Sequence, residues 1–132
     1  MISIQELKKN CKCRLKDAEV LLQDRRYDGA LYLCGYALEL KLKVRICRTL
    51  KWPEFPETKK EFENYQSLKT HSLDVLLSLT GRESKIKTQH LTDWSIVANW
   101  EPEMRYQPVG KINRNDVIDM ISATKRILKA LI

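Results

Sequence analysis

The sequence contains little of what would build a β-rich or membrane-spanning protein. It has four glycines and four prolines in 132 residues, too few for the many tight turns of an all-β chain. Its uninterrupted apolar runs are only a few residues long, so none is predicted to span a bilayer. Residues 1–10 lack the basic segment followed by an apolar core that is typical of a signal peptide. We therefore expect a cytoplasmic protein.

Cysteine and histidine are also scarce, and their spacing predicts neither disulfides nor a metal site. Cys11 and Cys13 are two residues apart, a spacing that does not share a helix face, and no Cys-x-x-Cys motif occurs. A chain of this length buries roughly two-thirds of its unfolded surface without such links. The four cysteines (Cys11, Cys13, Cys34 and Cys47) are predicted to be reduced core or boundary residues, and no metal or cofactor is expected.

Common catalytic motifs are missing. The sequence has no glycine-rich phosphate loop, no His-Glu-x-x-His motif and no pair of acidic residues on an apolar helix face. His71 opens a helical stretch, so we interpret it as a cap or packed side chain that tethers the preceding loop rather than as a catalytic base. His90 is interpreted as a surface residue. The sequence therefore predicts no catalytic residue.

The charge is unbalanced towards the basic side. The formal net charge is +7 and the isoelectric point is about 9.3. Most of the surplus lies in residues 1–50, which hold eleven lysines and arginines and six acidic residues. Such a surface permits contact with RNA, DNA, nucleotides or acidic proteins. An ordinary solvated basic surface is the alternative interpretation.

Two long amphipathic helices are predicted in the first half of the chain. Ser3 and Glu6 have the spacing of a capping box, and a helix over about 4–23 follows, with apolar residues at intervals of three and four. A second helix over about 27–50 carries two adjacent apolar stripes, wider than a surface helix needs. We therefore expect it at the centre of a bundle, with Glu39 and Lys43 paired at i and i+4 on its remaining solvated face.

The rest of the chain predicts shorter helices and one further long helix. Pro53 and Pro56 end the second helix, and a short helix around 57–65 is one interpretation of the segment that follows. A helix over about 70–79 ends at Gly81, residues 82–92 give no clear pattern, and another short helix covers 93–100. Asn113 is predicted to cap the last helix. The chain is therefore predicted to be a single all-α domain over residues 1–132, an up-and-down helical bundle of about five helices.

The loop over 101–115 carries the candidate binding residues. Arg105 can grip a phosphate through two donors while Tyr106 stacks on a base. Lys111 and Arg114 continue the basic trend towards the start of the last helix, where free backbone N–H groups favour an anion. Alternatively, Arg105 braces the loop through hydrogen bonds. Trp94 and Trp100 are predicted to be core residues.

Three stretches in this order resemble the HEPN family (higher eukaryotes and prokaryotes nucleotide-binding). They are YDGALYLCGYALELKLK at 27–43, THSLDVLL at 70–77 and WEPEMRYQP at 100–108. The resemblance covers most of the chain, with two long helices, a helix that opens with Thr-His, an Arg-Tyr-x-Pro loop and a long final helix. It implies a helical bundle that forms a homodimer, with a cleft between protomers that binds nucleotides or RNA.

The resemblance also implies a biological setting and a test for catalysis. Many HEPN members act with a nucleotidyltransferase as a toxin–antitoxin-like pair, and a ribonuclease subset carries a histidine four to six residues after an arginine. Here no histidine follows Arg105. We therefore expect a non-catalytic HEPN-type nucleotide-binding or RNA-binding module. The alternatives are a HEPN ribonuclease toxin that uses other residues, and a structural subunit that docks a nucleotidyltransferase.

Overall fold

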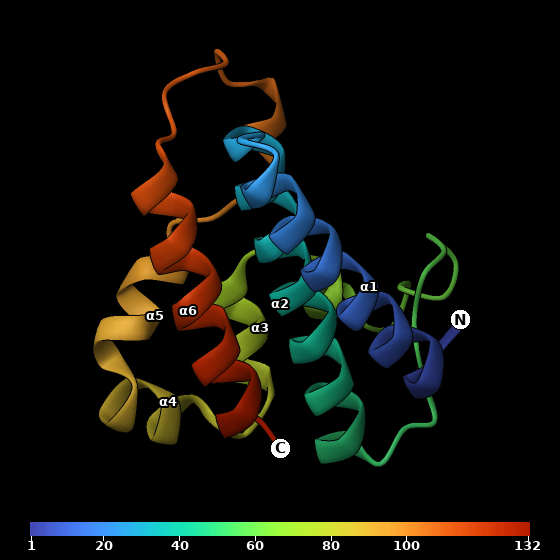
Figure 1. Cartoon of the computed structure of the whole chain (residues 1–132). Helices are drawn as coiled ribbons and strands as arrows, with labels where there is room; N and C mark the ends of the chain where they lie inside the picture. Colours follow the sequence, from blue (N-terminus) through green and yellow to red (C-terminus); the bar gives the residue numbers. More distant parts are fainter.

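The computed structural model describes all 132 residues and confirms the all-α class (Figure 1). Six α-helices make up most of the chain: α1 (Ile4–Gln23), α2 (Tyr27–Leu50), α3 (Leu73–Leu79), α4 (Glu83–Gln89), α5 (Leu91–Val97) and α6 (Arg114–Ala130). Two short 3-10 helices are η1 (Gln66–Leu68) and η2 (Pro102–Tyr106). The only strands are the two-residue β1 (Ile2–Ser3) and β2 (Glu54–Phe55), which pair antiparallel. No helix is long and apolar enough to cross a membrane.

Helices α1 and α2 form an antiparallel hairpin with the predicted helix bounds, and of the predicted capping box only the Ser3 hydrogen bond forms. The Ser3 hydroxyl accepts a hydrogen bond from the backbone N–H of Glu6 at 3.1 Å, which starts α1. A short turn follows, in which Arg25 has a φ of 60°. Helix α2 then runs unbroken to Leu50, and Lys51 ends it in the left-handed conformation just before Pro53.

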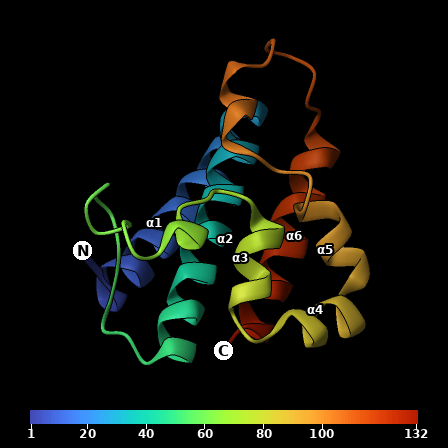
Figure 2. The same ribbon diagram turned by 180° about the vertical axis from the view of Figure 1, so that it is seen from behind.

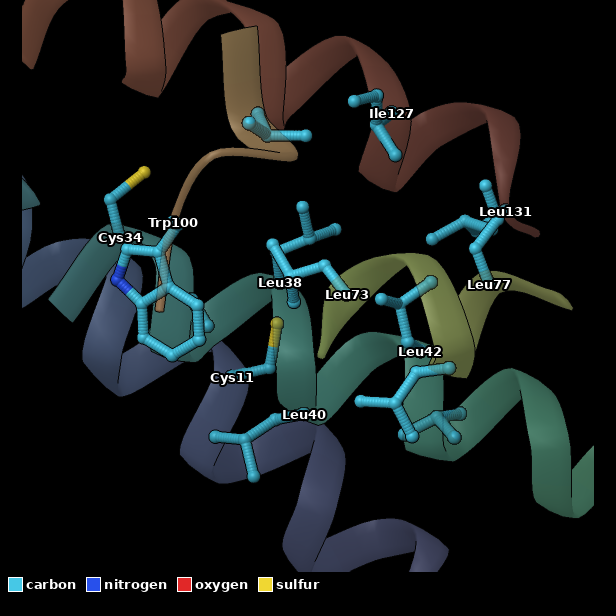
Figure 3. Close-up of a cluster of buried hydrophobic side chains, with 14 of the residues drawn as sticks. Cys11, Cys34, Leu38, Leu40, Leu42, Leu73, Leu77, Trp100, Ile127 and Leu131 are labelled. Carbon is cyan, nitrogen blue, oxygen red and sulfur yellow. The ribbon is translucent and has the colours of Figure 1, made fainter. Parts of the chain in front are cut away.

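Helix α2 is the centre of the bundle, as predicted. Half of its 24 residues are buried, and it contacts α1, α3, α6 and η2 (Figures 1 and 2). Figure 3 shows the core between these helices, where leucines of α2 and α3 meet apolar side chains of α6. The fully buried residues there include Leu38, Leu42, Leu73, Leu77, Ile127 and Leu131. Because other helices cover α2 on several sides, it needs the two apolar stripes seen in its sequence.

Two segments between the long helices differ from what the sequence indicated. Residues 83–89, which gave no clear pattern, form α4, so the bundle of about five predicted helices has six. Ile86 is the only buried residue of α4, and one apolar position leaves no periodicity to detect. The segment 58–64 is a series of turns rather than a short helix. Its position is fixed by burial of Phe55 and Phe62 and by the pairing of β2 with β1.

Three of the four cysteines are core residues as predicted, whereas Cys13 is exposed. All four are free, and Cys11, Cys34 and Cys47 are buried. Burial raises the pKa of Cys34 and of Cys47 to about 11. Since the thiolate is the reactive form of cysteine, these two side chains act as small core residues.

An ion pair joins α5 to α6. Asp93 is buried and accepts hydrogen bonds from Arg126 through both carboxylate oxygens, at 2.8–3.0 Å. Hydrogen bonding from Arg126 is the main cause that lowers the pKa of Asp93. A carboxyl with a depressed folded-state pKa stabilises the fold above its unfolded pKa of about 3.9, and that stabilisation is lost as the pH falls through the folded value.

We therefore expect Arg126→Met to lower the free energy of unfolding by about 1 kcal/mol at pH 7, because the arginine is half exposed and partly screened. The difference from the unmodified protein should shrink as the pH falls below about 3.9 and through the lowered folded-state pKa of Asp93. Urea unfolding at several pH values measures this, with Lys16→Met as the control, since Lys16 is exposed and makes no ion pair. If the difference in free energy of unfolding between the two proteins does not change with pH, the ion pair between Asp93 and Arg126 does not contribute as described.

Candidate functional site

The loop between α5 and α6 is anchored to α2 by Trp100. This indole is 4% exposed, which confirms its prediction as a core residue, and its Nε1 donates to the backbone carbonyl of Tyr32 at 3.1 Å. The ring lies directly against Gly35, where a Cβ atom would come within 2.2 Å of it. A glycine in the middle of a helix costs stability, and here its missing side chain provides the space for the indole.

Helix η2 follows this anchor and contains Arg105 and Tyr106. Nη1 of Arg105 donates to the Tyr32 hydroxyl at 3.3 Å. The guanidinium carbon lies 4.9 Å from the centre of the Tyr106 ring, and that ring is 76% exposed. Hydrogen bonding to Tyr32 is the main cause that raises the pKa of Arg105. No carboxylate pairs with Arg105, so its remaining donors face solvent.

Two further rings extend this arrangement along α2. The ring centres of Tyr32 and Tyr36 are 6.3 Å apart, and those of Tyr32 and Trp100 are 6.2 Å apart. Tyr32 and Tyr36 are partly exposed, and partial burial raises the pKa of Tyr36. We call Tyr106, Arg105, Tyr32 and Tyr36 the Arg105 row. It combines a forked cation with aromatic rings, the two kinds of group that hold nucleotides and single-stranded nucleic acids.

Lys111 and Arg114, the other two predicted binding residues, lie further along the loop. Lys111 lines a hollow of about 260 Å³ together with Asp28 and Glu101. Arg114 is the first residue of α6, whose N-terminus is already closed by a capping box between Asn113 and Asp116. The structure brings neither residue into contact with Arg105. Their part in binding stays a prediction, and the carboxylates nearby make the surroundings less favourable for an anion than the Arg105 row.

A buried carboxylate, Glu39, is the main feature that sequence reasoning missed. Its side chain is 1% exposed and not on a solvated face, so that prediction was wrong. The predicted pairing is correct, because Nζ of Lys43 lies 3.0 Å from Oε2 of Glu39. The other oxygen, Oε1, lies 2.9 Å from Nδ1 of His71. The sequence did place Glu39 between Leu38 and Leu40, which are both buried. It did not show which residues cover the carboxylate.

His71 tethers the loop before α3 to α2, as the sequence predicts, while the neighbouring Ser72 caps the helix by accepting from the N–H of Val75. The imidazole is 61% exposed and borders a hollow of about 420 Å³ that Tyr36, Lys43 and Lys69 also line. When Nδ1 of a neutral imidazole donates to Glu39, the other ring nitrogen, Nε2, is unprotonated. His90, predicted as a surface residue, is partly exposed with its Nδ1 3.6 Å from Asp93.

No protein-family model matches the chain, and neither the curated proteins nor the solved structures include a significant match.

Proposed function

We propose that this protein is a non-catalytic HEPN-type module that binds a nucleotide or RNA through the Arg105 row. One observation carries the proposal: the exposed Arg105 guanidinium lies between two tyrosines and has no carboxylate partner. An arginine that only braced a loop would gain most from a carboxylate or a backbone carbonyl. Arg105 instead has one neutral hydroxyl contact, and its other donors remain available.

The chemistry of the row suits a phosphate next to a base. A guanidinium offers paired donors in a plane, which match two oxygens of one phosphate. A tyrosine ring accepts any base by stacking, which contributes about 1–3 kcal/mol per base. Tyr106 supplies the most exposed ring, and Tyr32 and Tyr36 continue the aromatic surface along α2. The row is therefore compatible with unpaired nucleotides rather than with a duplex.

The family resemblance supplies the rest of the proposal. The module acts in the cytoplasm as a homodimer within a toxin–antitoxin-like or nucleotidyltransferase-associated system, with the Arg105 row facing the cleft between protomers. A structural subunit that only docks a nucleotidyltransferase is the alternative, and it makes no use of Arg105. Salt separates the two, because phosphate contacts weaken steeply with added salt while an apolar protein interface does not.

We expect Arg105→Lys to weaken binding of a single-stranded RNA or a nucleotide by about 1–3 kcal/mol, roughly 5- to 150-fold in Kd. Lysine keeps the charge but loses the paired donors and the stacking plane. The melting temperature should stay close to that of the unmodified protein, because the side chain is exposed and makes one hydrogen bond. Fluorescence anisotropy and thermal unfolding of the same preparation measure both effects.

Arg25→Lys is the matched control, since Arg25 is exposed and makes no hydrogen bond or ion pair through its side chain. It should bind as the unmodified protein does. Tyr32→Phe removes only the hydroxyl that holds Arg105, and it should cause an intermediate loss of affinity. If Arg105→Lys lowers the melting temperature and leaves the affinity of the folded protein unchanged, Arg105 is a structural brace and the proposal is wrong.

A second candidate function, ribonuclease activity, is favoured by one observation, the contact between His71 and the buried Glu39. In this reaction Nε2 of His71 takes the proton of a ribose 2′-hydroxyl, and the 2′-oxygen bonds to the adjacent phosphorus. The bond from phosphorus to the 5′-oxygen breaks, and that oxygen takes a proton from water. The products are a 2′,3′-cyclic phosphate and a strand with a 5′-hydroxyl. Lys69, which lines the same hollow, could bind the phosphate.

Under the leading proposal, incubation with single-stranded and structured RNAs should leave them intact, because no histidine follows Arg105 at the spacing that the HEPN ribonuclease subset uses. Gel analysis of end-labelled RNA measures this. The control variants are His71→Ala and His90→Ala. Cleavage by the unmodified protein that His71→Ala abolishes and His90→Ala preserves would replace the leading proposal with the second candidate.

A further inference from the structure

A basic groove lies between α1, α2 and the last turn of α6. It has a volume of about 410 Å³ and contains five cationic side chains and no acidic side chain. The residues that line this basic groove are Lys8, Cys11, Lys12, Lys41, Arg48, Leu128, Lys129 and Ile132. Three separate helices therefore bring their positive charges to one concave surface.

The charges of the basic groove are not neutralised within the protein. Ten ion pairs form in the molecule, and none of them includes a residue of the groove. Lys41 is partly buried. Burial is the main cause that lowers its pKa, and repulsion from Arg48, Lys8 and Lys12 lowers it further. Like charges held together in this way repel one another, and a bound anion would relieve the repulsion.

The basic groove is distinct from the Arg105 row. At 3.6 residues per turn, Lys41 and Arg48 project from the side of α2 roughly opposite to Tyr32 and Tyr36. The groove also includes the C-terminal end of α6, whereas the row contacts the loop that precedes α6. A ligand of the groove therefore does not depend on the function proposed for the row.

We propose that the basic groove binds a compact phosphate-rich anion, the oligophosphate chain of an inorganic polyphosphate or of a nucleoside polyphosphate. The volume lies within the range of small-molecule sites, about 300–1,000 Å³. Four lysine ammonium groups act as point charges that follow a chain of phosphates, and Arg48 adds a forked donor set. Leu128 and the partly buried stems of Lys8 and Lys41 form an apolar wall beside them.

A compact anion fits the groove better than an acidic protein segment does. A stable protein interface buries about 800 Å² on each partner and needs an apolar centre. The cations of the groove converge instead on one small volume. Carboxylates on a helix lie about 5–6 Å apart on neighbouring turns, so few could enter this space together. Several phosphates joined in one chain place their charges close enough to meet all five cations.

The test uses inorganic tripolyphosphate as the probe, with isothermal titration calorimetry at constant ionic strength. The groove variant is Lys41→Gln/Arg48→Gln, and the control is Lys9→Gln/Lys16→Gln, which removes the same net charge from exposed positions of α1 outside the groove. We expect binding to weaken at least tenfold in the groove variant and less than twofold in the control. Circular dichroism and thermal unfolding confirm that both variants are folded.

Further binding measurements identify the ligand and separate this groove from the Arg105 row. If ATP and tripolyphosphate bind with equal affinity and inorganic monophosphate binds much more weakly, the groove recognises the phosphate chain. If ATP binds more tightly than tripolyphosphate, the ligand is a nucleoside polyphosphate. The groove variant should bind single-stranded RNA as the unmodified protein does, because Lys41 and Arg48 lie outside the Arg105 row, so failure of the row and failure of the groove are distinguishable. Absence of tripolyphosphate binding, or equal losses in the groove variant and the control, would overturn the proposal. So would RNA affinity that falls in the groove variant while tripolyphosphate affinity does not, since the groove would then be a contact for nucleic acid.

Discussion

Gly35→Ala should destabilise the protein by about 2 kcal/mol, although alanine is the better helix former. In an open helix this change would gain about 1 kcal/mol. Here the new Cβ would lie 2.2 Å from the rigid indole of Trp100, and overpacking of this kind costs about 1–3 kcal/mol. The indole must move, so its hydrogen bond to the carbonyl of Tyr32 is also lost.

Gly29→Ala is a matched control on the same helix. Its Cβ would lie 3.3 Å from a terminal methyl group of Leu21, which can shift by a small amount. We expect this variant to equal or exceed the stability of the unmodified protein. Urea unfolding followed by tryptophan fluorescence measures both variants. If Gly35→Ala proves as stable as Gly29→Ala, the contact between Trp100 and α2 is not as tight as described.

Gly35→Ala should also weaken ligand binding by the Arg105 row. Trp100 lies two residues before η2, and displacement of its ring moves the segment that places Arg105 beside Tyr32. Folded Gly35→Ala protein should therefore bind nucleotide or RNA more weakly than folded Gly29→Ala protein. This links a packing contact in the core to the proposed binding site.

Lys43→Met should destabilise the protein by about 3 kcal/mol, because it leaves the charge of Glu39 buried with only His71 beside it. Removal of one member of a buried ion pair is costly, whereas replacement of both by apolar residues of similar size is often nearly neutral. The double variant Glu39→Met/Lys43→Met should therefore be more stable than the single variant. Chemical unfolding at pH 7 measures both.

Lys87→Met provides the surface comparison for this pair. Lys87 also pairs with a glutamate four residues away, Glu83, but both side chains are more than 40% exposed. Exposed pairs contribute about 0.2–1 kcal/mol, so this variant should lose less than about 1 kcal/mol. Similar losses in Lys43→Met and Lys87→Met would mean that the Glu39 carboxylate is effectively solvated, contrary to its burial in the structure.

The long elements of the fold could be predicted from the sequence because their apolar periodicity extends over many turns. Helices α1 and α2 begin and end where the pattern and the caps place them, and the width of the apolar surface on α2 indicates its central position. Helix α4 could not be predicted in the same way, because two turns with one buried isoleucine contain no repeat. The turns around Phe62 are fixed by tertiary contacts rather than by local pattern.

The candidate site was predicted only in part, because several of its contacts join residues that are far apart in the sequence. Arg105 and Tyr106 are adjacent, so a stacked pair could be expected from the sequence alone. The contact of Arg105 with Tyr32 spans 73 residues and depends on where Trp100 enters α2. The sequence analysis placed Glu39 on the solvated face of the helix. That prediction was wrong because a glutamate and a lysine four residues apart can pair equally well on an exposed face and on a buried one. The partner that distinguishes the two cases, His71, is 32 residues away.

The salt dependence of RNA binding tests the central claim most directly. Affinity for a single-stranded oligonucleotide, measured by anisotropy over a range of salt concentrations, gives a slope of about −0.7 for each phosphate contact. The account predicts binding that weakens steeply with salt, and a slope that is shallower by about 0.7 in Arg105→Gln than in the unmodified protein. Absence of binding at low salt, or identical slopes in the two proteins, would contradict it.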